Sequence, residues 1–136
     1  MRLPATCYRS PFWFLAFVIW FIVLWFLSSG PLPGPPAPDI PHLDKVLHFG
    51  YYFGGAGLLS AALYLRRRDL RIPWVVIHLT TIILVTTTGV TDEWHQSWYE
   101  FRSGNDAGDL AADFFGAVAG TLVFRRFRQL LEPDPN

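Results

Sequence analysis

The sequence predicts an all-α membrane protein: a polytopic bundle of four transmembrane helices with both termini in the cytoplasm. Three observations support this fold class, namely four long apolar runs, connectors rich in proline or charge, and basic residues gathered on one predicted side. The chain of 136 residues suits a single small domain and is 51% hydrophobic and 17% aromatic, with a formal net charge of zero. This charge balance gives no electrostatic basis for binding nucleic acid.

The first predicted helix covers residues 11–28, a nearly unbroken apolar run that contains three tryptophans. Small residues follow at positions 28–30, as they do in a secretory signal peptide. The run is longer than a usual signal-peptide core, however, and it lacks a clear A-x-A cleavage site. We therefore expect a helix that is retained in the membrane.

Three further helices are predicted from apolar runs of about 17 to 23 residues, which match the thickness of a bilayer core. A connector at 30–41 with six prolines cannot continue the first helix. The second helix is predicted at 46–65, the third at 73–95 with a proline in its first turn, and the fourth at 107–124. The tail at 129–136 is expected to be frayed.

The basic residues predict the orientation of the bundle. Of the 11 Lys and Arg residues, only Lys45 and Arg102 fall on the side opposite the termini. Cytoplasmic segments carry an excess of Lys and Arg, so the termini and the loop at 66–71 are expected in the cytoplasm. Most of the acidic residues then face outward.

Three predicted helix ends on the outer side carry polar residues at helical spacing. They are Asp44 with His48, then Asp92 with His95 and Gln96, and then Asp106 with Asp109 and Asp113. Residues three and four apart share a helix face, and short connections favour antiparallel neighbours. We expect these side chains to surround one outward-facing pocket, with Asp113 just beneath it.

The acid and histidine residues of this constellation have two interpretations. Asp44, His48, Asp92 and His95 are candidates for a divalent-metal site or for acid/base catalysis, because carboxylate and imidazole ligands suit Zn²⁺ or Mn²⁺. Alternatively, they form a hydrogen-bond network that holds the helix ends together, with each bond contributing about 1 kcal/mol in a membrane.

The remaining polar residues are candidates for ligand binding; they are Lys45, Glu93, Gln96, Arg102, Asp109 and Asp113. The planar guanidinium group of Arg102 is suited to an anionic headgroup or diphosphate. It is equally suited to pairing with Glu93, Asp106 or Asp109. Asp113 should face the bundle interior, because exposure of its charge to lipid would cost several kcal/mol.

Two small-residue patterns, Gly50-x-x-x-Gly54 and Gly116-x-x-x-Gly120, occur in the second and fourth predicted helices. Such patterns allow helix backbones to approach closely in membranes. We expect both faces to pack within the chain.

Across residues 40–124 the chain resembles the VanZ-like family of small bacterial membrane proteins. The resemblance lies in the DKVLHF segment from Asp44, the DEWHQ segment from Asp92, Arg102, and the DLAADFFGAVAG segment from Asp109. Asp113 stands where the family usually has asparagine, which puts an amide role there in doubt. The Trp-Tyr-Glu stretch before Arg102 also departs from the family pattern.

The resemblance implies a protein of the bacterial cell envelope; together with the apolar runs and the charge pattern, this predicts a multi-pass protein of the cytoplasmic membrane with its polar cluster on the extracytoplasmic side. The founding member of the family is associated with low-level resistance to the glycopeptide teicoplanin. Three functions stay open: binding of an envelope amphiphile such as a lipid phosphate or cell-wall precursor, metal-assisted or acid/base catalysis on such a lipid, and a structural role. No sequence signature of a familiar hydrolase or transferase is present.

Overall fold

The computed structural model describes residues 4–30, 40–100, 102 and 104–132, and its regular secondary structure in these ranges is entirely helical. The long helices are α1 (Ser10–Ser28), α2 (Leu43–Leu70), α3 (Trp74–Gln96) and α4 (Ala107–Phe127). Two short 3-10 turns flank them: η1 (Ala5–Tyr8) before α1 and η2 (Arg128–Leu131) after α4. All four long helices are long and apolar enough to cross a membrane, as the sequence predicted.

The structure extends the second predicted helix at both ends. Helix α2 begins at Leu43 and ends at Leu70, beyond the apolar run at 46–65, because backbone hydrogen bonds continue the helix through polar residues at both ends. Arg71 then ends the helix in a left-handed conformation, with its N–H bonded to the carbonyl of Arg67 at 2.7 Å. Most of the proline-rich connector lies outside the described residues.

The C-terminal segment is more ordered than the sequence indicated. The expectation of fraying from residue 129 is wrong for 129–132, because η2 packs its Leu131 into the bundle and leaves that side chain only 5% exposed. Tyr64 on α2 also donates a hydrogen bond to Glu132 at 2.5 Å. The last four residues of the predicted tail lie outside the described part of the chain.

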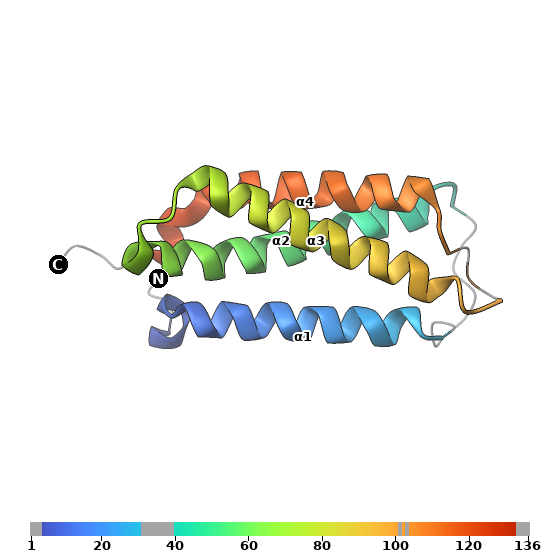
Figure 1. The fold of residues 1–136 in the computed structure, drawn as a ribbon, viewed down its shortest axis with the longest axis horizontal. Coiled ribbons are helices and arrows are strands. Elements are labelled where there is room, and N and C mark those ends of the chain that lie inside the picture. Colours follow the sequence, from blue (N-terminus) through green and yellow to red (C-terminus); the bar gives the residue numbers. More distant parts are fainter. Residues whose placement is uncertain (1–3, 31–39, 101, 103, 133–136) are drawn as a thin grey trace.

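Helices α2 and α4 form the most extensive contact of the bundle, and α3 packs against both (Figure 1). Helix α1 lies along α2 and has a smaller contact with α3. Only Leu24 and Ser28 of α1 are buried, so most of its apolar side chains face outward. This arrangement leaves α1 as the peripheral helix of the bundle.

The close approach of α2 and α4 depends on the glycines of only one helix. A Cβ at Gly116 would lie 2.5 Å from the carbonyl oxygen of Phe49, and one at Gly120 would collide with the carbonyl oxygen of Phe53. By contrast, a Cβ at Gly50 or Gly54 would meet no atom within 4 Å. The prediction of two packing faces holds for α4 and is wrong for the pattern in α2, whose two glycines face open space.

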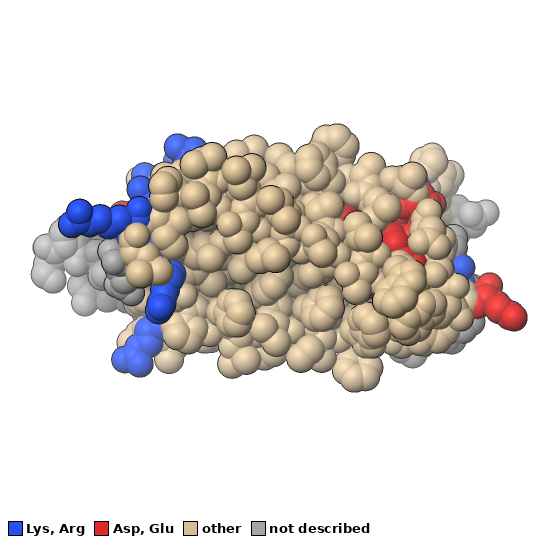
Figure 2. All heavy atoms as spheres, viewed as in Figure 1, with Lys and Arg blue, Asp and Glu red and all other residues tan. Residues whose placement is uncertain are grey.

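Charge separates along the bundle axis (Figure 2). Both 3-10 turns lie at one end, where most of the Lys and Arg side chains in view gather. The acidic side chains in view lie mainly at the opposite end, where α2 and α4 begin and α3 ends. We call these the basic end and the acidic end.

Candidate functional site

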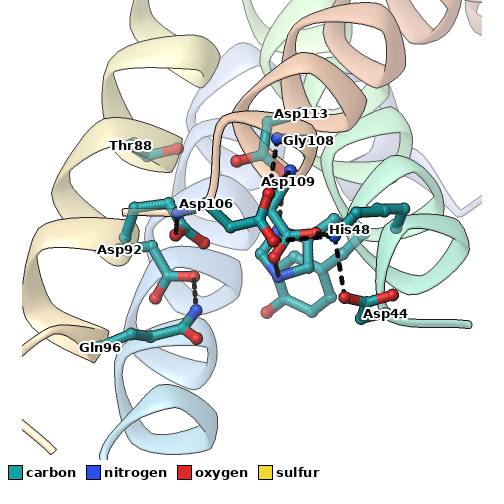
Figure 3. Close-up of polar contacts among 12 residues, drawn as sticks. Asp44, His48, Thr88, Asp92, Gln96, Asp106, Gly108, Asp109 and Asp113 are labelled. Atoms are coloured by element: carbon teal, nitrogen blue, oxygen red, sulfur yellow. Dashed lines mark hydrogen bonds and ion pairs between the residues drawn. The ribbon is translucent and has the colours of Figure 1, made fainter. Parts of the chain in front are cut away.

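Polar side chains from three helices meet at the acidic end (Figure 3). Asp44 and His48 come from the first turns of α2, Asp92 and Gln96 from the end of α3, and Asp109 and Asp113 from the start of α4. The antiparallel course of these helices brings segments distant in sequence to one place. The expected convergence of three helix ends is therefore present in the structure.

Lys45 is the centre of the outer part of this cluster. Its Nζ lies 2.9 Å from Asp44 Oδ2, 3.1 Å from Asp106 Oδ2 and 3.0 Å from Asp109 Oδ1. The hydrogen bond from Lys45 lowers the pKa of the Asp106 carboxyl group. Asp106 also caps α4, because its Oδ1 accepts a hydrogen bond from the Gly108 N–H at 2.6 Å.

The partly buried His48 pairs with the fully buried Asp113 beneath Lys45. The Nδ1 atom of His48 lies 2.9 Å from Asp113 Oδ1, and Nε2 lies 4.0 Å from Asp109 Oδ2. Asp113 is completely buried, and its Oδ2 has no hydrogen-bond partner among the described residues. A Cβ at Gly89 on α3 would collide with this oxygen, so glycine at that position makes room for the carboxyl group.

Asp92 and Glu93 are neighbours on α3 and are both buried, at 3% and 2% exposure. Asp92 accepts hydrogen bonds from Ser28 on α1, through Oδ1, and from Gln96, through Oδ2 at 2.8 Å. Glu93 Oε2 accepts the backbone N–H of Asp106 at 2.8 Å. The second oxygen of Glu93, Oε1, is buried without a hydrogen-bond partner in the described part of the chain.

Arg102 does not make the carboxylate pairs proposed for it, within the described residues. Its Nη2 donates to the carbonyl oxygens of Leu27 and Gly30, at 2.8 and 2.7 Å. The last carbonyl groups of an α-helix have no partner within the helix, and a cation there also interacts favourably with the helix dipole. Arg102 thus holds the end of α1 against the loop after α3.

His95 faces α1 and not the acid cluster. Its ring stacks on Trp25 with a centroid distance of 3.7 Å and an angle of 15° between the ring planes. Its Nε2 lies 3.4 Å from the hydroxyl oxygen of Tyr99. The proposed metal set of Asp44, His48, Asp92 and His95 is therefore not assembled among the described residues, because the His95 ring is stacked on Trp25 and belongs to neither group of side chains with metal-ligand spacing.

A cavity of about 530 Å³ adjoins the cluster between α1, α2 and α3. Its walls are mostly apolar, with Leu24 and Leu27 on α1 and Leu47 on α2. Its polar lining gathers at the acidic end and consists of Ser28, Asp44, His48, Asp92, Gln96 and Arg102. The cavity thus has an apolar part and a polar part, as the site of an amphiphilic ligand should have.

Two groups of side chains in the described chain have the spacing of metal ligands. The first comprises His48, Asp92 and Glu93, and the second comprises Asp44, Asp106 and Asp109; within each group, one potential ligand atom per residue lies within 4.8 Å of the others. In the second group the Lys45 ammonium already bonds all three carboxylates. A positive charge therefore already occupies the centre of the second group.

The structure also reveals site residues that sequence reasoning missed or undervalued. Ser28 was considered only as part of a cleavage signal, yet it bonds Asp92 from another helix. Asp106 was expected near the pocket, but its cap of α4 and its bond to Lys45 were not foreseen. An aspartate just before the first apolar residue of a helix is a known capping signal. No comparable signal marks Ser28.

Comparisons with protein-family models, with curated proteins and with solved structures found no significant match. The assignment of chemistry to this chain therefore depends on the geometry of the acidic end.

Proposed function

We propose that this chain is a VanZ-like multi-pass protein of the bacterial cytoplasmic membrane that binds an envelope amphiphile at its acidic end. The ligand belongs to the class of lipid phosphates and cell-wall precursors, and the acidic end faces the extracytoplasmic side. A role in tolerance to teicoplanin-type glycopeptides would follow if the ligand is a cell-wall precursor.

The observation that carries this proposal is the two-part lining of the 530 Å³ cavity. Ligand pockets of about 300–1,000 Å³ are typical of small-molecule sites, and a few polar groups in an apolar lining set the orientation. Leu47 is 58% exposed and Leu27 is 43% exposed beside this cavity, so a hydrocarbon chain can reach it from the lipid side. The polar lining then lies where a headgroup would sit.

Arg102 is the cation best placed to meet an anionic headgroup. A guanidinium group has five N–H donors; here Nη2 bonds the carbonyl oxygens of Leu27 and Gly30 and Nε is buried, so the two N–H groups of Nη1 are the donors left for a ligand among the contacts of the described residues. The carboxylates Asp44 and Asp92 also line the cavity and can accept hydrogen bonds from a headgroup that carries hydroxyl or amine donors beside its phosphate. Cell-wall precursors have such groups on their sugars and peptides.

The incomplete pairing of the cluster argues against a purely structural role. Hydrogen-bond networks that only stabilise a fold satisfy their buried polar atoms, because an unpaired one costs about 1–3 kcal/mol. Here Glu93 Oε1 and Asp113 Oδ2 are buried without partners among the described residues, and Asp92 and His48, which adjoin them, line the cavity. A loss of folding stability of this kind is typical of a site that functions in ligand binding.

Binding can be tested with the purified full chain in detergent micelles. A long-chain polyprenyl phosphate is titrated and followed by native mass spectrometry, with the uncharged polyprenol as the comparison ligand. We expect a one-to-one complex with the phosphate and at least about tenfold weaker binding of the alcohol, a difference of about 1.4 kcal/mol. Equal binding of both lipids would contradict a specific headgroup site.

A matched pair of substitutions locates the site. Leu47→Trp adds bulk to a cavity wall, whereas Leu79→Trp adds the same bulk at an exposed position of α3 that does not line the cavity. We expect only Leu47→Trp to weaken binding of the polyprenyl phosphate. If both variants bind as the wild type does, the lipid lies elsewhere on the bundle.

A further inference from the structure

We propose that His48, Asp92 and Glu93 form a binding site for a first-row divalent metal ion, of the Mn²⁺ or Zn²⁺ class. One potential ligand atom from each residue lies within 4.8 Å of the others, and α2 and α3 supply them from opposite sides. The proposal is independent of the amphiphile, because it depends only on the contacts of these side chains.

The orientation of His48 is the first argument. Its Nδ1 is held by Asp113 Oδ1 at 2.9 Å, which leaves Nε2 as the free ring nitrogen. Metal-binding histidines almost always bond a carboxylate or carbonyl group through the nitrogen that does not bind the metal. In the neutral tautomer with the proton on Nδ1, Nε2 carries the lone pair that a metal requires. The contact with Asp113 thus orients the His48 ring so that its Nε2 is the nitrogen available to a metal ion.

Glu93 supplies the second argument. Its side chain is only 2% exposed, and Oε1 has no hydrogen-bond partner among the described residues. The other oxygen accepts the Asp106 N–H, which fixes the carboxylate in place. An anionic oxygen that is buried without a donor is costly, and a bound cation would remove this cost.

Asp92 completes the set and connects it to the cavity. Ser28 and Gln96 each donate to one of its oxygens, so the carboxylate is oriented by residues of two helices and retains free lone pairs. Asp92 and His48 both line the 530 Å³ cavity, which gives an ion a route to the site. Asp109, whose Oδ2 lies 4.0 Å from His48 Nε2, is placed to contribute a further oxygen.

The donor set selects the class of ion. Mixed imidazole and carboxylate ligands suit Zn²⁺ and Mn²⁺, whereas Ca²⁺ and Mg²⁺ prefer oxygen ligands alone. The second acidic group around Asp44 is not a competitor, because Lys45 already supplies a cation there. This second group therefore offers no competing metal site at the same end of the bundle.

The test uses the tag-free chain in detergent, stripped with a chelator and free of added lipid. Zn²⁺, Mn²⁺ and Mg²⁺ are titrated separately by calorimetry, and bound metal is counted by elemental analysis after desalting. We expect one equivalent of Zn²⁺ or Mn²⁺ and little uptake of Mg²⁺. Metal should also raise the melting temperature of the wild type, because a ligand that binds only the folded state stabilises it.

Four variants assign the ion to the site. Glu93→Gln keeps the shape of the side chain and its acceptor for Asp106 but removes the charge, and we expect at least tenfold weaker binding. Glu100→Gln neutralises an exposed acid after α3 that belongs to neither acidic group, and His42→Gln removes an exposed histidine before α2; both should bind within about twofold of the wild type. Co²⁺ should show ligand-field absorption bands that disappear in His48→Gln.

Several outcomes would overturn the proposal. They are the absence of stoichiometric metal and of any melting shift in the wild type, equal loss in Glu100→Gln and Glu93→Gln, or Co²⁺ bands that survive in His48→Gln. Because no lipid is present, each of these results leaves the amphiphile proposal standing. Conversely, a chain that binds metal but no polyprenyl phosphate would support only the metal site.

Discussion

The basic end and the acidic end of this bundle both carry many charges, but they hold them in different ways. At the basic end, the guanidinium groups of Arg67, Arg125 and Arg128 lie 5.0 to 5.8 Å from the ring centroid of Trp74. Arg125 is exposed and Arg128 is half-buried. At the acidic end, Asp92, Glu93, Asp109 and Asp113 are at most 4% exposed.

This difference distinguishes exposed charges, whose surroundings are interchangeable, from buried charges, which have fixed partners. Exposed arginines meet water or lipid headgroups, so one can replace another at little cost. A buried carboxylate depends on particular partners, because an unpaired charge in a low-dielectric interior costs several kcal/mol. Single substitutions should therefore have small effects at the basic end and large effects at the acidic end.

The orientation of the two ends gives the largest expected effect. A reporter that is active only outside the cytoplasm should be active when inserted at Gly104, in the loop of the acidic end, and silent when fused after Glu132. The expected contrast is all or none, because an excess of Lys and Arg favours a cytoplasmic location for the basic end. The reverse pattern would place the acidic cluster in the cytoplasm and would remove the basis for an extracytoplasmic ligand.

Gly89→Ala should destabilise the buried part of the acidic end. The added methyl group would collide with Asp113 Oδ2 and lie 3.1 Å from Asp113 Cβ. Overpacking of this kind costs about 1–3 kcal/mol, to be measured by unfolding in detergent. Gly57→Ala on α2, where a Cβ meets no atom within 4 Å, is the matched control and should not destabilise. Equal stability of both variants would show that Asp113 can move freely.

Arg102→Ala should lower stability by about 1–3 kcal/mol, because it removes two charged hydrogen bonds at the end of α1. Arg126→Ala, an exposed arginine of α4 at the basic end, should change stability by less than about 0.5 kcal/mol. Thermal unfolding of both variants in one detergent gives the comparison. A larger loss for Arg126→Ala would reverse the distinction between the two ends.

The smallest expected effect is a pH dependence at the acidic end. Lys45 lowers the pKa of Asp106 in the folded state, so the stability contributed by this group is complete above its unfolded pKa near 4. That stability is lost as the pH falls further, through the folded pKa. Asp106→Asn should therefore flatten the acid limb of a melting-temperature profile, whereas Glu100→Gln, an exposed acid nearby, should leave it unchanged. A parallel profile for Asp106→Asn would show that Lys45 does not protect this carboxylate.

The helices and their order were predictable because hydrophobic runs of membrane length leave few alternatives to a helix. The convergence of Asp92 and Asp109 was also predictable, since short loops force antiparallel neighbours. The face that each residue occupies was less predictable. His95 and Gln96 are adjacent in sequence, yet Gln96 bonds Asp92 while His95 stacks on Trp25.

The sequence by itself determined four apolar helices, a polar end and the segregation of arginines, because these follow from composition and from periodicity along the chain. Only the tertiary structure decided which partner each polar group has. The rotation of α3 turned His95 toward α1 and placed Glu93 beside His48, and the position of α1 gave Arg102 a helix end to hold. Such pairings depend on distances between helices, and no local pattern in the chain records those distances.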